Sequence, residues 1–159
     1  MKQGQIFFVG FLSGIVVILA VIIIMMPRLM IMTHESRYQD VDQTVHALQA
    51  SIVKEGWRSP GVRDISGTIT KEGLSFAIPI RIVELCKAGY AKDVLTTNPE
   101  MSTLMPCAWG VYQGKDGKVY ISGMNMGLMG KLFGGNIAKV MSGQVAPEEA
   151  RMLKAVVKE

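Results

Sequence analysis

The sequence is poor in the residues from which most catalytic and metal sites are built. Its 159 residues include two cysteines, Cys86 and Cys107, and two histidines, His34 and His46. There is no CxxC pair and no CxxCH motif, which excludes covalent c-type haem attachment. GxSxG, HExxH and a Ser/His/Asp arrangement are also missing. Glu84 is the only carboxylate in the main strand-forming run, so we expect no catalytic residues and a protein that is not an enzyme.

Blocks of like charge are missing as well. The 17 basic and 13 acidic residues give a net charge of +4 and are scattered along the chain. This distribution does not indicate a nucleic-acid partner. The small excess of basic over acidic residues favours a weak attraction to anionic lipid headgroups. The glycine-rich stretch GMNMGLMGKLFGGN matches neither the phosphate-binding loop nor the dinucleotide fingerprint.

One long apolar run is present, at residues 6–26: IFFVGFLSGIVVILAVIIIMM. A helix of this length spans roughly 30 Å, the thickness of the hydrocarbon core of a bilayer. The run is longer than the apolar part of a signal peptide and ends in bulky residues instead of a small-x-small cleavage site. It predicts an uncleaved transmembrane anchor at residues 1–32, followed by a polar linker at 33–39.

The orientation of this anchor follows from its short N-terminal head. Lys2 and the terminal amine lie on one side, and Arg28 lies on the other. The basic residues are nearly balanced, but a four-residue head is easily left in the cytoplasm. We expect a single-pass protein of the bacterial inner membrane, with its C-terminal domain in the periplasm. Gly10 and Gly14 form a GxxxG face that predicts contact with another membrane subunit or a second copy, although glycine is common in membrane helices.

Residues 40–159 alternate between helix and strand patterns. Apolar residues at helical spacing predict a helix over 40–56, and glycine ends it. Further helices are expected at 64–72, at 91–105 with an interruption near Asn98, around 132–141 and from Pro147 onward, where Glu148 and Glu149 suit the helix dipole. Extended segments are expected at 57–62 and 76–85. Two runs, 107–112 and 119–122, flank an Asp-Gly turn and predict a β-hairpin.

This order predicts an α+β domain, a small sheet with a hairpin packed against helices. The expected core residues come from both kinds of element: Val45, Leu48, Ile52, Ile82, Val111, Tyr120, Ile121 and Leu153. His46 is expected to face solvent. His34 is expected to be a solvated linker residue, with a metal or haem ligand as the alternative.

Two segments resemble a known family. VELCKAGYAKDVL and LMPCAWGVYQGKDGKVYISGMNMGLMGKLFGG look like the domain of unknown function 302 family. The resemblance covers about residues 40–157. It implies a compact α+β domain that occurs alone or behind a membrane segment, and it implies no established reaction.

The two cysteines allow three interpretations. Cys86 closes one strand and Cys107 opens the next long one, so an antiparallel pair would place both thiols at one end of the sheet. A structural disulfide suits an exported domain. A reactive or metal-binding thiol pair and two buried free cysteines are the alternatives.

Methionines follow the hairpin closely. Met124, Met126 and Met129 form an MxMxxM stretch, and thioether sulfur is a soft ligand that suits Cu(I). Together with Cys86 and Cys107 they form a candidate copper site. The alternative is a flexible apolar packing surface.

Three functions remain open from the sequence. The first is a membrane-anchored accessory or binding module of a larger membrane complex. The second is a periplasmic redox or copper-handling protein that uses the cysteines and methionines. The third is a small-molecule sensor with a pocket between sheet and helices.

Overall fold

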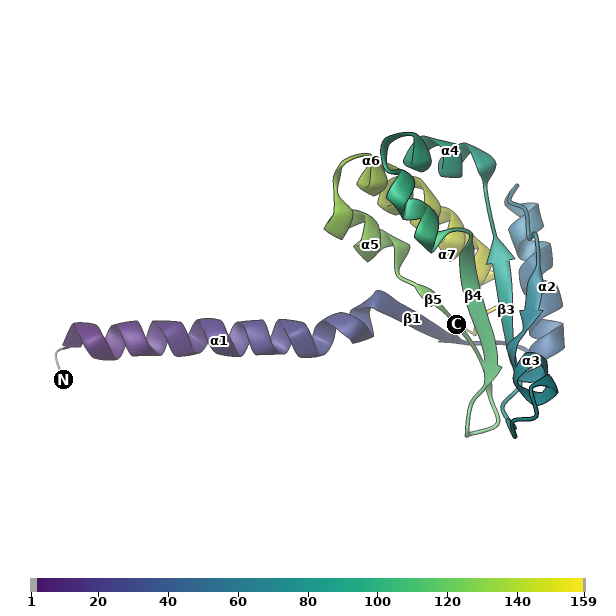
Figure 1. Cartoon of the computed structure of the whole chain (residues 1–159), viewed down its shortest axis with the longest axis horizontal. Helices are drawn as coiled ribbons and strands as arrows, with labels where there is room; N and C mark the ends of the chain where they lie inside the picture. The colour runs from purple at the N-terminus through teal and green to yellow at the C-terminus, as the bar shows by residue number, and fades with distance from the viewer. Residues whose placement is uncertain (1–2, 159) are drawn as a thin grey trace.

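The computed structural model describes residues 3–158 and has an extended helix followed by an α+β domain (Figure 1). The helices and strands run in this order: α1 Gln3–Met30, β1 Ile31–Glu35, α2 Val41–Lys54, β2 Val62–Asp64, α3 Ile65–Lys71, β3 Ile80–Leu85, α4 Ala88–Thr97, η1 Pro99–Leu104, β4 Cys107–Gln113, β5 Val119–Met124, α5 Met126–Phe133, α6 Gly135–Ile137, η2 Ala138–Val145 and α7 Ala146–Lys154.

The five strands form one antiparallel sheet in the order β1-β5-β4-β3-β2. The predicted hairpin is present as β4 and β5, with Val111 opposite Ile121. Gly117 in its turn has a φ of 78°, a conformation that glycine adopts without steric cost. The α+β fold class predicted from the order of elements is therefore confirmed.

Strand β1 replaces part of the expected linker. Residues 33–39 were expected to connect anchor and domain, but Ile31–Glu35 pair with β5, and Thr33 lies opposite Ser122. Met32 and His34 face the helices, and Thr33 and Glu35 face away from them. The side chains thus alternate between the two faces of the sheet, although the sequence IMTHE shows no alternation of apolar and polar residues. The chain therefore passes from α1 into the sheet without an intervening linker.

Helices α2 and α7 cover one face of the sheet and bury a single core. The buried strand residues alternate along each strand: Val83 and Leu85, Trp109 and Val111, Val119 and Ile121. Leu48, Ile52 and Leu153 from the helices join them, as predicted. Val45 and Val111 were also predicted correctly.

Ile82 and Tyr120 were wrongly placed in the core. Both are only half-buried, because the residues next to them in sequence point to the helices instead. Side chains alternate between the faces of a strand, so an error of one position moves a residue to the opposite face. Tyr120 stacks there on Tyr112, with ring centroids 5.9 Å apart.

Two predicted strands lie at shifted positions. The strand expected at 76–85 begins only at Ile80, after Pro79. An extended segment was expected at 57–62, but strand β2 lies at Val62–Asp64. Within 57–62, Arg58 forms an isolated bridge with Cys86. The interrupted helix at 91–105 is seen as α4 and η1, which meet at Asn98.

Helix α1 projects away from the domain (Figure 1). Its segment Phe11–Met30 is long and apolar enough to cross a membrane, and a signal sequence passes the same test. The space beside Gly14 is open, because no atom lies within 4 Å of the position that a Cβ would take there. Gly10 also lies in α1, but its surroundings lie outside the residues whose side chains the structure describes.

Candidate functional site

A cavity of about 360 Å³ lies between β1 and α7. We call it the β1–α7 cavity. Apolar atoms make up most of its wall, which is typical of small-molecule sites. Its wall comes from β1, the start of α5, α7 and the C-terminal residues: Met32, His34, Asn125, Gly127, Ala146, Glu149, Ala150, Leu153, Lys154, Val157 and Lys158.

Glu149 is the unusual residue of this cavity. It lies on α7 one turn before Met152 and Leu153, and its side chain is 2% exposed. Its Oε1 atom makes no hydrogen bond within the described residues. Burial raises the pKa of this carboxyl from its ordinary 4.5 to about 8. At neutral pH the group is therefore mainly a neutral acid, which can both donate and accept a hydrogen bond.

His34 lines the same cavity and is not the solvated linker residue that the sequence predicted. It lies on β1 opposite Ile121, on the face that the helices cover, and is half-buried. His46, by contrast, is exposed as expected. The exposed ends of Lys154 and Lys158 lie at the rim of the cavity. The site thus combines an apolar body, one buried acid and a basic rim.

Hydrogen bonds connect the wall of the cavity to the C-terminal end of α1. Asn125, which lines the cavity, donates from its backbone N–H to the carbonyl of Met30 at 2.8 Å. Its side-chain Nδ2 donates to the carbonyl of Leu29 at 3.2 Å. Met32 follows α1 by two residues and forms part of the opposite wall. The site therefore lies where the apolar helix enters the domain.

The prediction from the sequence missed Glu149, because both adjacent glutamates were interpreted as residues that stabilise the helix dipole. A signal was present: Met152 and Leu153 follow Glu149 by three and four positions, which places the carboxylate on the apolar face of α7. An acid on the apolar face of a helix is a buried polar group that requires an explanation.

Glu148, the neighbour of Glu149, is fully satisfied. It accepts hydrogen bonds from Trp57 Nε1 at 2.6 Å, from Lys87 Nζ at 2.9 Å and from Tyr90 OH at 2.8 Å. Lys87 also lies over the Tyr90 ring, 4.6 Å from its centroid. Burial acts to raise the pKa of Glu148, but the bonds from Lys87, Trp57 and Tyr90 outweigh it and lower the pKa.

The two cysteines lie at the same end of the sheet, as predicted. Leu85, the last residue of β3, pairs with Cys107, and Cys86 directly follows the strand. Both line a narrow cleft beside Trp57 and Tyr90, and both are free thiols. Burial, with smaller contributions from Glu149 and Cys86, raises the pKa of Cys107 to about 12. A thiol that remains protonated at neutral pH is a poor nucleophile.

The predicted methionines gather around one of these cysteines. Met124, Met126, Met129 and Cys107 line a second, smaller cavity between η1, β4 and α5. Cys86 lines the neighbouring cleft instead. Four of the five predicted copper ligands therefore share one site.

Comparisons with known proteins give a family and a fold. A family model for a domain of unknown function, DUF302, matches residues 32–159. The crystal structure of an uncharacterized conserved DUF302 protein from Bacillus stearothermophilus is similar, with a TM-score of 0.70 and 21% sequence identity. The match covers 79% of this chain and 97% of that one. No curated protein matches the chain.

Proposed function

The chain belongs to the DUF302 family, and we propose that its domain is a membrane-tethered binding module. Its ligand is a mainly apolar small molecule, held in the β1–α7 cavity. The family description assigns no function, so the cavity itself carries the proposal. The size and apolar wall of the cavity suit a compact organic molecule.

The observation that carries this proposal is the unpartnered acid in an apolar cavity. An unbonded polar group buried in a protein costs about 1–3 kcal/mol. A ligand with one hydrogen-bond donor, such as a hydroxyl or an amine, offsets this cost by bonding to Oε1 of Glu149. Buried groups with a strongly shifted pKa are concentrated at functional sites. Glu149 thus supplies the polar contact that orients the ligand.

The place of the cavity supports tethering to a membrane. We propose that α1 is an uncleaved signal anchor of the bacterial inner membrane, with the N-terminus in the cytoplasm and the domain in the periplasm. Because Asn125 binds the end of α1, the cavity then lies at the membrane surface. An apolar molecule is concentrated there by partition into lipid.

The tether also suggests an accessory role. Gly10 and Gly14 lie four residues apart in α1, and small residues at this spacing allow close contact between membrane helices. We propose that this GxxxG face binds another integral membrane subunit, so that the domain serves a larger complex. A second copy of the chain is the other partner that this face would fit.

Filling the cavity tests the proposed binding. Ala150→Trp places a large ring in the β1–α7 cavity, and Ala155→Trp places the same ring on an exposed position of the chain outside it. The full chain is purified from its membranes in lipid nanodiscs, and native mass spectrometry detects retained small molecules. We expect the wild type and Ala155→Trp to retain the same compound and Ala150→Trp to lose it. Equal retention by all three proteins would refute the site.

A further inference from the structure

The methionines of the domain are concentrated in one place. Seven methionines follow residue 40 in the sequence, and six of them line the second cavity. We call this the sulfur cavity; its lining includes Met101, Met105, Met124, Met126, Met129 and Met141 around Cys107. The seventh, Met152, is buried between α7 and α2, and Met32 in β1 lines the β1–α7 cavity. Methionine that only fills gaps would be distributed through the core, whereas six of the eight methionines from β1 onward lie at one end of the sheet.

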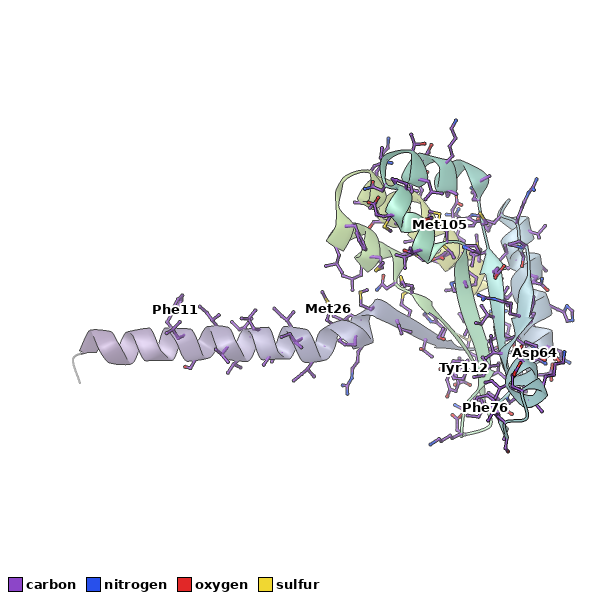
Figure 2. The ribbon with its side chains drawn as sticks, in the orientation of Figure 1. Phe11, Met26, Asp64, Phe76, Met105 and Tyr112 are labelled. Carbon is purple, nitrogen blue, oxygen red and sulfur yellow. The ribbon has the colours of Figure 1, made fainter. Side chains whose placement is uncertain are left out.

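The sulfur atoms come from several separate elements. Met101 belongs to η1, Cys107 to β4, Met124 to β5, Met126 and Met129 to α5. These elements meet at the end of the sheet opposite the β4–β5 turn. Figure 2 shows Met105 at this end and Tyr112 at the other. Tertiary folding therefore places Cys107 and six methionines around one cavity.

The chemistry of this lining selects one class of ligand. The remaining lining residues are apolar, Leu104, Phe133 and Ile137, and no group of three or more His, Cys, Asp or Glu is found within residues 3–158 that could hold a metal. Hard cations require oxygen ligands, and structural zinc sites use several cysteines or histidines. Thioether and thiolate sulfur are soft ligands that favour Cu(I).

We propose that the sulfur cavity binds one Cu(I) ion through the Cys107 thiolate and methionine thioethers. On binding, the S–H bond of Cys107 is broken, a Cu–S bond forms and the proton passes to solvent. No oxidation or reduction takes place. The product is neutral overall, because one thiolate balances one monovalent cation, so its burial avoids the cost of an isolated charge.

A coordinating thiol releases its proton when the Cu–S bond forms, and this proton passes to solvent. Leu104 and Phe133, which are 38% and 53% exposed, lie at the outer wall and provide an entry from the surface. This site is separate from the β1–α7 cavity and does not depend on the function proposed there.

Competition for Cu(I) tests the proposal. The full chain in detergent is titrated without oxygen and with a reductant present, against the chromophoric Cu(I) chelator bicinchoninate. We expect one Cu(I) per chain. Cys107→Ser and the double variant Met126→Leu, Met129→Leu should each lower the affinity at least about tenfold. Met and Leu have similar volumes, so the double variant should retain the fold, which circular dichroism checks.

Two controls separate the site from its surroundings. Met152→Leu changes a buried methionine outside the sulfur cavity, and Cys86→Ser removes the thiol of the neighbouring cleft. Both should bind Cu(I) as the wild type does, and X-ray absorption should show sulfur ligands only. The proposal is overturned if the wild type does not compete for Cu(I). It is also overturned if Met152→Leu weakens binding as much as the double variant does.

Discussion

Two adjacent glutamates on α7 show how local surroundings give the same side chain opposite properties. Glu148 accepts bonds from a lysine, a tryptophan and a tyrosine, and its pKa is lowered. Glu149, one position later, faces the core, where its Oε1 atom has no partner among residues 3–158, and its pKa is raised. Glu148 is a structural anion, whereas Glu149 is a neutral acid available to a ligand.

The raised pKa of Glu149 predicts a pH dependence of stability. In the unfolded chain the carboxyl titrates near 4.5, and in the folded domain it titrates near 8. Between these values the folded state binds one proton more than the unfolded state. The free energy of unfolding therefore falls as pH rises through this range, by up to about 1.4 kcal/mol per pH unit. The contribution of the neutral acid is fully present below pH 4.5 and is lost above pH 8.

Glu149→Gln should remove this decline, because an amide has nearly the shape of the protonated acid and does not ionise. Urea unfolding of the domain at pH 5, 6, 7 and 8 measures the slope for both proteins. Glu148→Gln is the matched control: the lowered pKa of Glu148 lies below this range, so the decline should persist there. An identical decline in Glu149→Gln would show that Glu149 is not the titrating group.

At the scale of elements, the helices and strands that have local sequence signals were predicted, whereas the strand that depends on pairing with a distant segment was missed. The β4–β5 hairpin carries its own turn signal, and α2 carries a helical apolar face with Asp40 as its N-cap. Strand β1 has no such signal, because it is a strand only through its pairing with β5. The β1–α7 cavity depends on that pairing, so His34 and Glu149 could not be brought together from the sequence.

Helix α1 is the element through which we propose contact with another membrane subunit. Gly10→Ile with Gly14→Ile should weaken association with a partner helix, because side-chain bulk prevents close approach of the backbones. The variant should remain in the membrane fraction, since isoleucine favours insertion. Co-purification from gently solubilised membranes measures the loss. Ala20→Ile, a similar increase in size on another face of α1, is the control that should retain the partner.

On the scale of the whole molecule, a long apolar helix is joined to a compact α+β domain that matches the DUF302 family. The two cavities lie on different parts of this domain, one beside α1 and β1 and the other beside η1 and α5. The sequence predicted the domain and its fold class. It placed Met124, Met126, Met129, Cys86 and Cys107 in one candidate site, but Cys86 lines the neighbouring cleft, and nothing indicated that Met101, Met105 and Met141 line the sulfur cavity.

The proposed orientation of the whole chain can be tested with a reporter fused after Glu159. Alkaline phosphatase, which folds only outside the cytoplasm, should be active, and a cytoplasmic fluorescent reporter should be dark. The expected result follows from the proposed role of α1 as a signal anchor that leaves the domain in the periplasm. The reverse pattern would overturn the periplasmic location.

The direct passage from α1 into β1 decides where a protease can release the domain without destroying it. The C-terminal residues are also fastened to this region, because Lys158 donates its backbone N–H to the carbonyl of Glu35, and Arg37 donates to Val156. A cut before Ile31 leaves the sheet whole. A cut near residue 40 removes β1, exposes the edge of β5 to other chains and opens the wall of the β1–α7 cavity. Shedding from a membrane is therefore compatible with ligand binding only if it occurs within α1.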